Sequence, residues 1–282
     1  MYRRRQAPMR YSSGFSGRRG GKGRLLIGLA FAAFAFFSYC SSKEYNPVTG
    51  EEQYVSLTPK QEIAIGLQST PQMIEQYGGL YPDQRAQDFV DKIGNRLLKN
   101  SEKISELPWE FEFHLLRDPE AINAFALPGG QVFITQALFS RLQTEGQLAG
   151  VLGHEIGHVV ARHGAQRIAK SELTQGLTGA VMTASGDAGS AQMAAMIGQM
   201  INMKYGREDE LQSDELGIKL MSKAGYDPRS MIGVMEILAA ASSGNRQPEF
   251  FSTHPNPENR IEKIRSAIQE VFPSGVPSGL EP

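Results

Sequence analysis

Apolar side chains recur every three or four residues in several stretches of the chain, which is the period of a helix with one buried face. Thr58 and Pro59 are typical of an N-cap and the first helical residue. Thr144 with Gln147 three residues later predicts a capping box. We predict helices over residues 58–67, 82–99, 144–164, 229–241 and through the acidic stretch that ends before Gly225.

Two other stretches follow the period of strands. Residues 109–116 alternate apolar and charged side chains, which predicts a half-buried strand. His114 falls on its polar side, so we expect a structural or exposed histidine there. Residues 121–127 and 131–135 are short apolar segments on either side of a Pro-Gly-Gly turn, and they predict a hairpin.

The N-terminal segment has the charge pattern of an export signal. Residues 1–24 carry eight Arg or Lys and no acid, and residues 25–40 are uncharged and mostly apolar. Basic residues stay in the cytoplasm, so we expect a bacterial envelope protein whose remaining chain lies on the periplasmic side. The apolar stretch is shorter than the roughly 20 residues of a comfortable span. Cleavage with lipid attachment at Cys40 and a short retained membrane anchor both remain open.

Composition divides the chain into four parts. We expect the signal or anchor over residues 1–40, a tether over 41–57, one domain over 58–272 and a tail over 273–282. Without the eight N-terminal cations, 21 Lys or Arg face 30 acidic residues, a net charge of about −9. That charge argues against a nucleic-acid partner. The single cysteine excludes an intramolecular disulfide.

Residues 154–158 read His-Glu-Ile-Gly-His, which is the H-E-x-x-H pattern of zinc peptidases. His154 and His158 lie one helical turn apart on the same face, so both can bind one ion. Glu155 lies about 100° around the helix, beside the ion, where it can take a proton from water. His163 lies off that face, and we do not expect it to be a ligand. The pattern predicts one zinc ion per chain; two ordinary histidines on a surface helix are the alternative.

A zinc site of this type needs a third protein ligand and an open position for water. Residues 207–214 concentrate acidic side chains, and Glu210 and Asp214 are four apart on one helix face. We expect Glu210 to bind the metal and Asp214 to accept a hydrogen bond from a ligand histidine. The alternative is a solvated acidic helix start that the helix dipole favours.

A further histidine lies on a loop that prolines constrain. Residues 250–255 enter this loop, and Asn256 and Pro257 predict the cap and first residue of the last helix. We expect His254 to reach the cleft, where it would stabilise an oxyanion or fill the open zinc position and hold the enzyme latent. Arg260 is expected to anchor the loop by ion pairing.

Residues 173–203 are rich in Gly, Ala, Ser, Met and Thr, with a break predicted over residues 185–189. Two interpretations fit this composition. The favoured one is a pair of amphipathic helices packed on the core. The other is a Met-lined lid, or a hairpin in contact with a membrane, over the cleft.

Four elements, in this order, resemble the gluzincin zinc peptidases of metallopeptidase family forty-eight. That family includes the CAAX prenyl protease, the HtpX-like bacterial proteases and quality-control proteases of the periplasm and mitochondria. The resemblance covers about residues 50–270. Gly206 and Ser213 stand where the family usually has Ser and Ala. The elements are residues 123–126 before the Pro-Gly-Gly turn, the motif at 154–158, the R-x-x-E-x-x-x-D pattern at 207–214, and Thr-His-Pro at 253–255 followed by Arg260.

The resemblance implies an α+β fold that is predominantly helical and zincin-like, with a small sheet bordering the active-site cleft. It also implies that His154, His158 and Glu210 are the zinc ligands. By the same resemblance, Glu155 is the catalytic acid and base.

The resemblance further implies that the first hairpin strand borders the cleft, where an extended peptide would add as another strand. Such binding recognises backbone more than sequence, which suits unfolded chains. We therefore expect a zinc metalloendopeptidase that acts on unfolded or misassembled envelope proteins. The alternatives are a latent or weakly active protease that acts mainly as a chaperone, and a metal-stabilised structural lipoprotein. The expected substrate-binding residues are Asn123, Ala124, Phe125 and Ala126.

Overall fold

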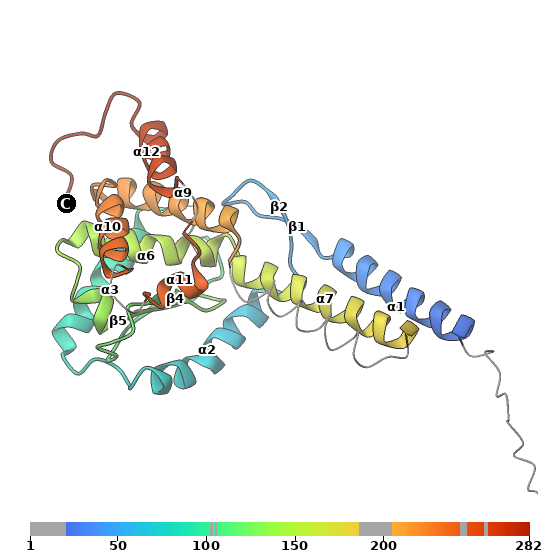
Figure 1. Ribbon diagram of the computed structural model, residues 1–282. Coiled ribbons are helices and arrows are strands. Elements are labelled where there is room, and N and C mark those ends of the chain that lie inside the picture. Colours follow the sequence, from blue (N-terminus) through green and yellow to red (C-terminus); the bar gives the residue numbers. More distant parts are fainter. Residues whose placement is uncertain (1–20, 102–103, 105, 186–204, 243–246, 257–258) are drawn as a thin grey trace, which may run out of the picture.

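The computed structural model describes residues 21–101, 104, 106–185, 205–242, 247–256 and 259–282. Most of these residues are helical, and two small sheets complete an α+β fold, as predicted (Figure 1). The helices are α1 Gly21–Ser41, α2 Pro59–Gln76, α3 Gln84–Lys99, α5 Gln136–Phe139, α6 Glu145–Val160, α7 His163–Ser185, α9 Arg207–Ala224, α10 Ser230–Ser242, α11 Phe250–Thr253 and α12 Arg260–Val271. The strands are β1 Lys43–Tyr45, β2 Glu52–Tyr54, β3 Glu112–Leu116, β4 Ala124–Ala126 and β5 Gln131–Thr135.

Helix α6 lies at the centre of the domain, between α9, α10, α3 and the sheet (Figure 1). Every residue from Gly146 to Val160 except Gln147 is buried, because other elements cover α6 on all sides. The Thr144 side chain accepts from the Gln147 backbone N–H, as the predicted capping box requires. The Gln147 side chain instead accepts from the Gln143 N–H, so only half of the box forms.

The larger sheet has the order β3-β5-β4. Strands β4 and β5 form the predicted antiparallel hairpin, and β3 pairs with β5 in parallel. Gly129 and Gly130 make the turn at φ values of 88° and 121°, which favour glycine. The strand predicted over 109–116 begins only at Glu112. In the sheet, β4 is an edge strand, and α6 lies against it.

Several helix boundaries differ from the prediction. Helix α2 begins after the predicted N-cap, Thr58, which also forms a capping box with Gln61, but it continues to Gln76 rather than residue 67. Helix α6 does not continue through residue 164, because Arg162 adopts a left-handed φ of 58° and α7 starts directly after it. Pro257, the predicted first residue of the last helix, lies outside the described residues. Helix α12 begins at Arg260, after Asn259 at φ 67°, and residues 250–253 form the short helix α11 rather than a loop.

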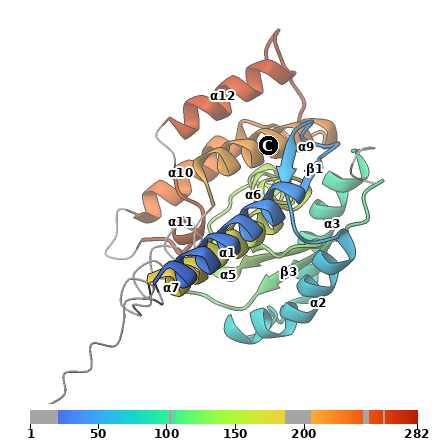
Figure 2. The same cartoon turned by 90° about the vertical axis from the view of Figure 1, so that its right-hand side faces the viewer.

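Helix α1 projects from the domain beside α7 (Figures 1 and 2). Residues 22–41 of α1 are long and apolar enough to cross a membrane, a test that a signal sequence also passes. Eight large apolar side chains of α1 are exposed, each by half or more. Ser185, the first residue of the predicted break, is the last residue of α7. Residues 186–189 and the methionines between 193 and 203 lie outside the described residues.

The segments predicted as a tether and a tail both contact the domain. Strands β1 and β2 form a hairpin, in which the Asn46 side chain donates to the Val160 carbonyl at the end of α6. At the other terminus, Glu281 accepts from Arg96, and the Pro282 carbonyl accepts from the Gly146 N–H. Both contacts stabilise the ends of core helices.

Candidate active site and metal centre

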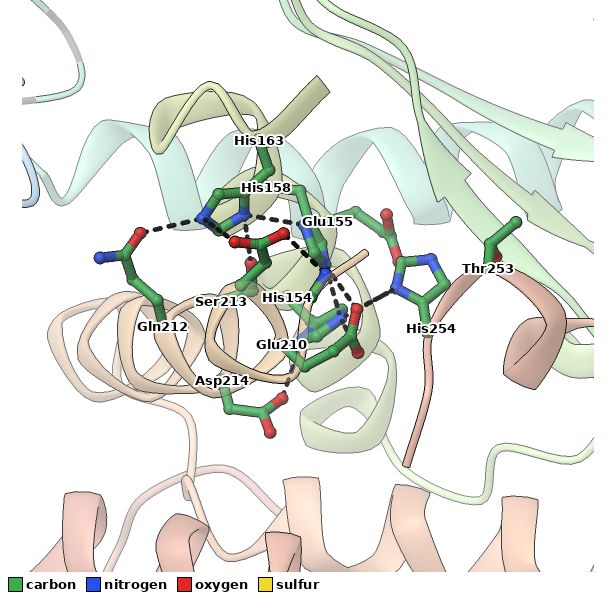
Figure 3. Close-up of polar contacts among 12 residues, drawn as sticks. His154, Glu155, His158, His163, Glu210, Gln212, Ser213, Asp214, Thr253 and His254 are labelled. Carbon is green, nitrogen blue, oxygen red and sulfur yellow. Dashed lines mark hydrogen bonds and ion pairs between the residues drawn. The ribbon is translucent and has the colours of Figure 1, made fainter. Parts of the chain in front are cut away.

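Helix α6 supplies three side chains of one buried cluster (Figure 3). The Nε2 atoms of His154 and His158 lie 3.1 Å apart, so both rings point at the same space. Neither ring is more than 4% exposed. Glu155 is fully buried beside them. The helical spacing therefore has the consequence predicted from the sequence: two convergent nitrogens with a carboxylate next to them.

Glu210 enters the cluster from α9, which crosses α6 at very short range (Figure 3). A Cβ atom on Gly157 would lie 2.9 Å from the Ser213 carbonyl oxygen, and one on Gly153 would lie 3.3 Å from the Gly217 Cα. Only glycine permits this approach. It lets the Glu210 carboxylate come within 3.5 Å of His154 Nε2 and 3.4 Å of His158 Nε2.

His254 completes the group from the residue after α11. Its Nδ1 atom lies 3.0 Å from Glu210 Oε1 and 3.4 Å from His154 Nε2. Phe250 stacks on the imidazole with 4.3 Å between ring centroids. The Phe250 N–H donates to the Ile122 carbonyl, just before β4. These contacts hold His254 against the other three side chains.

These four side chains fit a metal ion. A tetrahedral zinc site with bonds of about 2.0 to 2.1 Å places its ligand atoms about 3.3 to 3.4 Å apart. The five short distances within the group run from 3.0 to 3.5 Å. Glu210 Oε2 is buried, and among the described residues it has no hydrogen-bond partner but makes an ion-pair contact of 3.1 Å with the Arg260 guanidinium. Imidazole nitrogens and a carboxylate are the donors that zinc takes in catalytic sites.

The charges of the cluster also fit a cation. Three buried carboxylates, from Glu155, Glu210 and Asp214, face a single buried guanidinium, that of Arg260. When these four groups are ionised and the histidines are neutral, as metal ligands must be, the excess of two negative charges matches a divalent ion. Burial alone would raise the pKa of Glu210, but hydrogen bonds with His154 and two further histidines outweigh it and hold this pKa far below its usual range.

Asp214 and Arg260 form a buried ion pair behind His154. Asp214 Oδ1 lies 2.8 Å from His154 Nδ1, which leaves Nε2 of that ring for the metal group. The Arg260 guanidinium donates to both oxygens of Asp214 at 2.7 and 2.8 Å, and it lies 3.1 Å from Glu210. Burial would lower the pKa of His154, but the carboxylates of Asp214 and Glu210 raise it to about 9. The guanidinium thus ties α12 to Asp214 and Glu210 of α9.

Glu155 differs from the other carboxylates. Both of its oxygens are buried without a hydrogen-bond partner among the described residues, and His254 Nε2 lies 3.7 Å from Oε1. Burial raises its pKa, and the nearby His254 and His154 only partly offset this. A buried carboxylate with a raised pKa and free oxygens is suited to accept and return a proton.

The predicted substrate strand lies beside the metal helix but contributes no atom to the ligand group. Ala126 and His158 line the same small cavity. Ala124 is buried and Phe125 half-buried. The Asn123 side chain donates to Tyr77 and Glu249 and so braces the segment that leads to His254. His114 bonds Gln131 within the sheet, remote from the ligand group, as its place on the polar face of the strand predicted.

Sequence reasoning missed two features of this site. His163 is not one of the four clustered donors, but its Nδ1 lies 2.9 Å from His158 Nδ1. The left-handed turn at Arg162, which creates this contact, has no clear sequence signal. The close crossing of α6 and α9 did have a sequence signal, because Gly153 and Gly157 lie four residues apart in an apolar helix.

Comparison with known proteins identifies the family. The model of peptidase family M48 matches residues 84–268. The beta-barrel assembly-enhancing protease of Escherichia coli strain K12 is 30% identical over 268 residues, which cover 90% of this chain and 52% of that protein. The mitochondrial metalloendopeptidase OMA1 of Schizosaccharomyces pombe is 29% identical over 235 residues, 82% of this chain and 68% of that protein. The chain thus spans about half the length of the assembly-enhancing proteases it matches. With the family model covering most of the domain that contains the H-E-x-x-H helix, the chain belongs to peptidase family M48.

Proposed function

We propose that the chain is a zinc-dependent metalloendopeptidase of the cell envelope. The observation that carries the proposal is the convergence of four donors, with a fifth side chain, Glu155, buried beside them and not hydrogen-bonded to any described residue. A binding module has no need for that carboxylate. Zinc, rather than another divalent ion, is favoured by two imidazoles and one carboxylate in tetrahedral spacing.

Each residue has a distinct role in this proposal. His154, His158 and Glu210 hold the ion, which supplies Lewis acidity to water and to the scissile carbonyl. Glu155 accepts a proton from the attacking water and delivers it to the leaving amine. Asp214 orients the His154 ring, and its double hydrogen bond with Arg260 holds it in place.

An extended peptide would bind along β4. Alternate N–H and C=O groups of an edge strand point away from its partner, and a peptide can pair with them whatever its sequence. We infer that unfolded or misassembled envelope proteins are the substrates. The name of the assembly-enhancing relatives agrees with this class of substrate.

The basic N-terminus would stay in the cytoplasm, with the domain on the periplasmic side. The chain would be anchored by α1 or by lipid on the exposed Cys40.

Loss of the Glu155 carboxylate tests the proposal. The full chain purified in detergent should digest casein, and a chelator should abolish digestion until zinc is restored. Glu155→Gln should keep its zinc and lose about 10²- to 10⁴-fold in rate, the typical contribution of a general acid and base. If both proteins hold zinc and neither cuts casein, the result contradicts the protease proposal and favours the chaperone alternative.

His254 is proposed to hold this form of the enzyme latent. Its Nδ1 lies among the other three donors, where it would fill the fourth position of a bound ion. None of the four donor residues is more than 4% exposed, so a peptide would reach them only when His254 moves away, and digestion by the wild type should be slow. His254→Ala should therefore raise casein digestion, whereas His114→Ala, outside the site, should not. A fall of about 10²- to 10³-fold would contradict latency and support a role for His254 in stabilising the oxyanion.

A further inference from the structure

The two histidines of the metal helix are held by different partners (Figure 3). A carboxylate, that of Asp214, accepts from His154 Nδ1. A third imidazole, that of His163, meets His158: the two Nδ1 atoms lie 2.9 Å apart, and both residues are 2% exposed. Two ring nitrogens at this distance need one hydrogen between them. Which ring supplies it decides whether His158 Nε2 has a lone pair for a metal.

The neighbours of His163 settle the direction of this hydrogen bond. Gln212 Nε2 donates to Glu51 Oε2 at 2.8 Å, because an ionised carboxylate only accepts. The Gln212 carbonyl oxygen therefore faces His163 Nε2, at 2.9 Å. An amide oxygen also only accepts, so His163 Nε2 carries the hydrogen. In a neutral imidazole, the other nitrogen, Nδ1, is then an acceptor.

We propose that His163 is the positioning residue of His158, with its tautomer set from the protein surface by Gln212 and Glu51. His158 Nδ1–H donates to His163, and His158 Nε2 turns its lone pair towards His154 and Glu210. Each hydrogen bond in the series from Glu51 through Gln212 and His163 to His158 has one allowed direction. The inference rests on the proposed metal centre and assigns a role to a residue outside its four donors.

The backbone is built to make this contact. On a continuous helix, a residue five places after His158 would point about 140° away from it. The left-handed turn at Arg162 ends α6 and redirects His163 towards His158. Such a conformation is costly for a residue with a side chain and persists only where its surroundings hold it. Here, Glu62 accepts from the Arg162 guanidinium at 2.8 Å, and the Leu57 carbonyl accepts at 2.7 Å.

Zinc affinity, measured by competition with a chelator, tests the proposal in the full chain. His163→Leu removes the acceptor and should weaken zinc binding about 10- to 100-fold, the usual effect of losing a partner of a metal ligand. His163→Asn places an amide oxygen near the position of Nδ1 and should restore most of the affinity. His114→Leu is a matched control, because His114 also pairs with a glutamine, Gln131 at 2.8 Å, but outside the site. It should lower stability towards urea and leave zinc affinity unchanged.

The tautomers can also be observed directly by long-range proton–nitrogen NMR of the histidine rings in the zinc-loaded protein. Hydrogen on Nε2 of His163 and on Nδ1 of His158 is the expected result. This measurement needs no substitution, so it decides the question even if His163→Leu does not fold. Hydrogen on Nδ1 of His163, or equal zinc affinity of wild type and His163→Leu, would overturn the inference and leave the proposed protease intact. Failure of the wild type to bind zinc would overturn both.

Discussion

Two pairs of helices in this molecule pack at very short range through a glycine. The two pairs differ in burial and in the side chains that surround the contact. Helices α6 and α9 cross where Gly157 faces the Ser213 backbone. Helices α1 and α7 run antiparallel, and there a Cβ atom on Gly28 would lie 2.7 Å from the Ala180 carbonyl oxygen. The first pair is buried and carries histidines and carboxylates between its helices. In the second pair, α1 runs beside α7 (Figure 2), and most of the apolar side chains of α1 are exposed.

The difference shows what small residues contribute and what they do not. Close approach lets side chains from two helices converge, as Glu210 does with His154 and His158. The chemistry comes from the residues around the contact. Around the contact of α1 with α7 these are mainly apolar or small, so close packing there brings no charged groups together. Helix α1 alone is long and apolar enough among the described helices to cross a membrane. Substitutions in each pair should therefore have separate consequences.

The largest effect is expected for a charge in α1. Leu29 is 57% exposed on this helix, and aspartate near the centre of a membrane span costs about 3 kcal/mol, or more than 100-fold in partitioning. Leu29→Asp should release the chain from membranes on carbonate extraction while zinc content stays the same. Leu67→Asp, at an exposed apolar position of α2, should release nothing. Equal release of both variants would contradict a membrane role for α1.

The next effect is expected behind the metal group. Asp214→Asn keeps the shape of the side chain but loses the charge between His154 and Arg260. Zinc affinity should fall about 10- to 100-fold in chelator competition, and membrane attachment should not change. An unchanged zinc affinity would show that the His154 ring needs no carboxylate to orient it.

The smallest effect is expected at the helix crossing itself. A methyl group on Gly157 would press on the Ser213 backbone, and overpacking of this kind typically costs about 1 to 3 kcal/mol. Urea unfolding of Gly157→Ala should show this loss. Gly179→Ala in α7 is the control: a Cβ there meets no atom of the described residues within 4 Å, so the higher helix propensity of alanine should stabilise by up to about 1 kcal/mol.

The sequence predicted the parts of this site that depend on local spacing. Residues four apart on a helix share a face wherever the helix lies, so the convergence of His154 with His158 and the placing of Glu210 with Asp214 needed no tertiary information. The hairpin with its Pro-Gly-Gly turn followed in the same way from its turn residues.

Features that depend on tertiary contacts escaped prediction. The left-handed Arg162 is held by Glu62, a hundred residues earlier, and no local pattern marks that pair. The start of α12 moved to Arg260, whose guanidinium is drawn into the buried acidic cluster. The packing of α1 along α7 brings together segments far apart in the sequence, and composition described each of them only separately.

The most direct test of the account is a crystal structure of the wild-type chain with anomalous diffraction recorded on both sides of the zinc absorption edge. The account predicts one anomalous peak, present only above the edge, within about 2.0 to 2.2 Å of His154 Nε2, His158 Nε2 and a Glu210 oxygen. A zinc peak elsewhere in the chain, or none between these three side chains in protein supplied with zinc, would contradict the central claim.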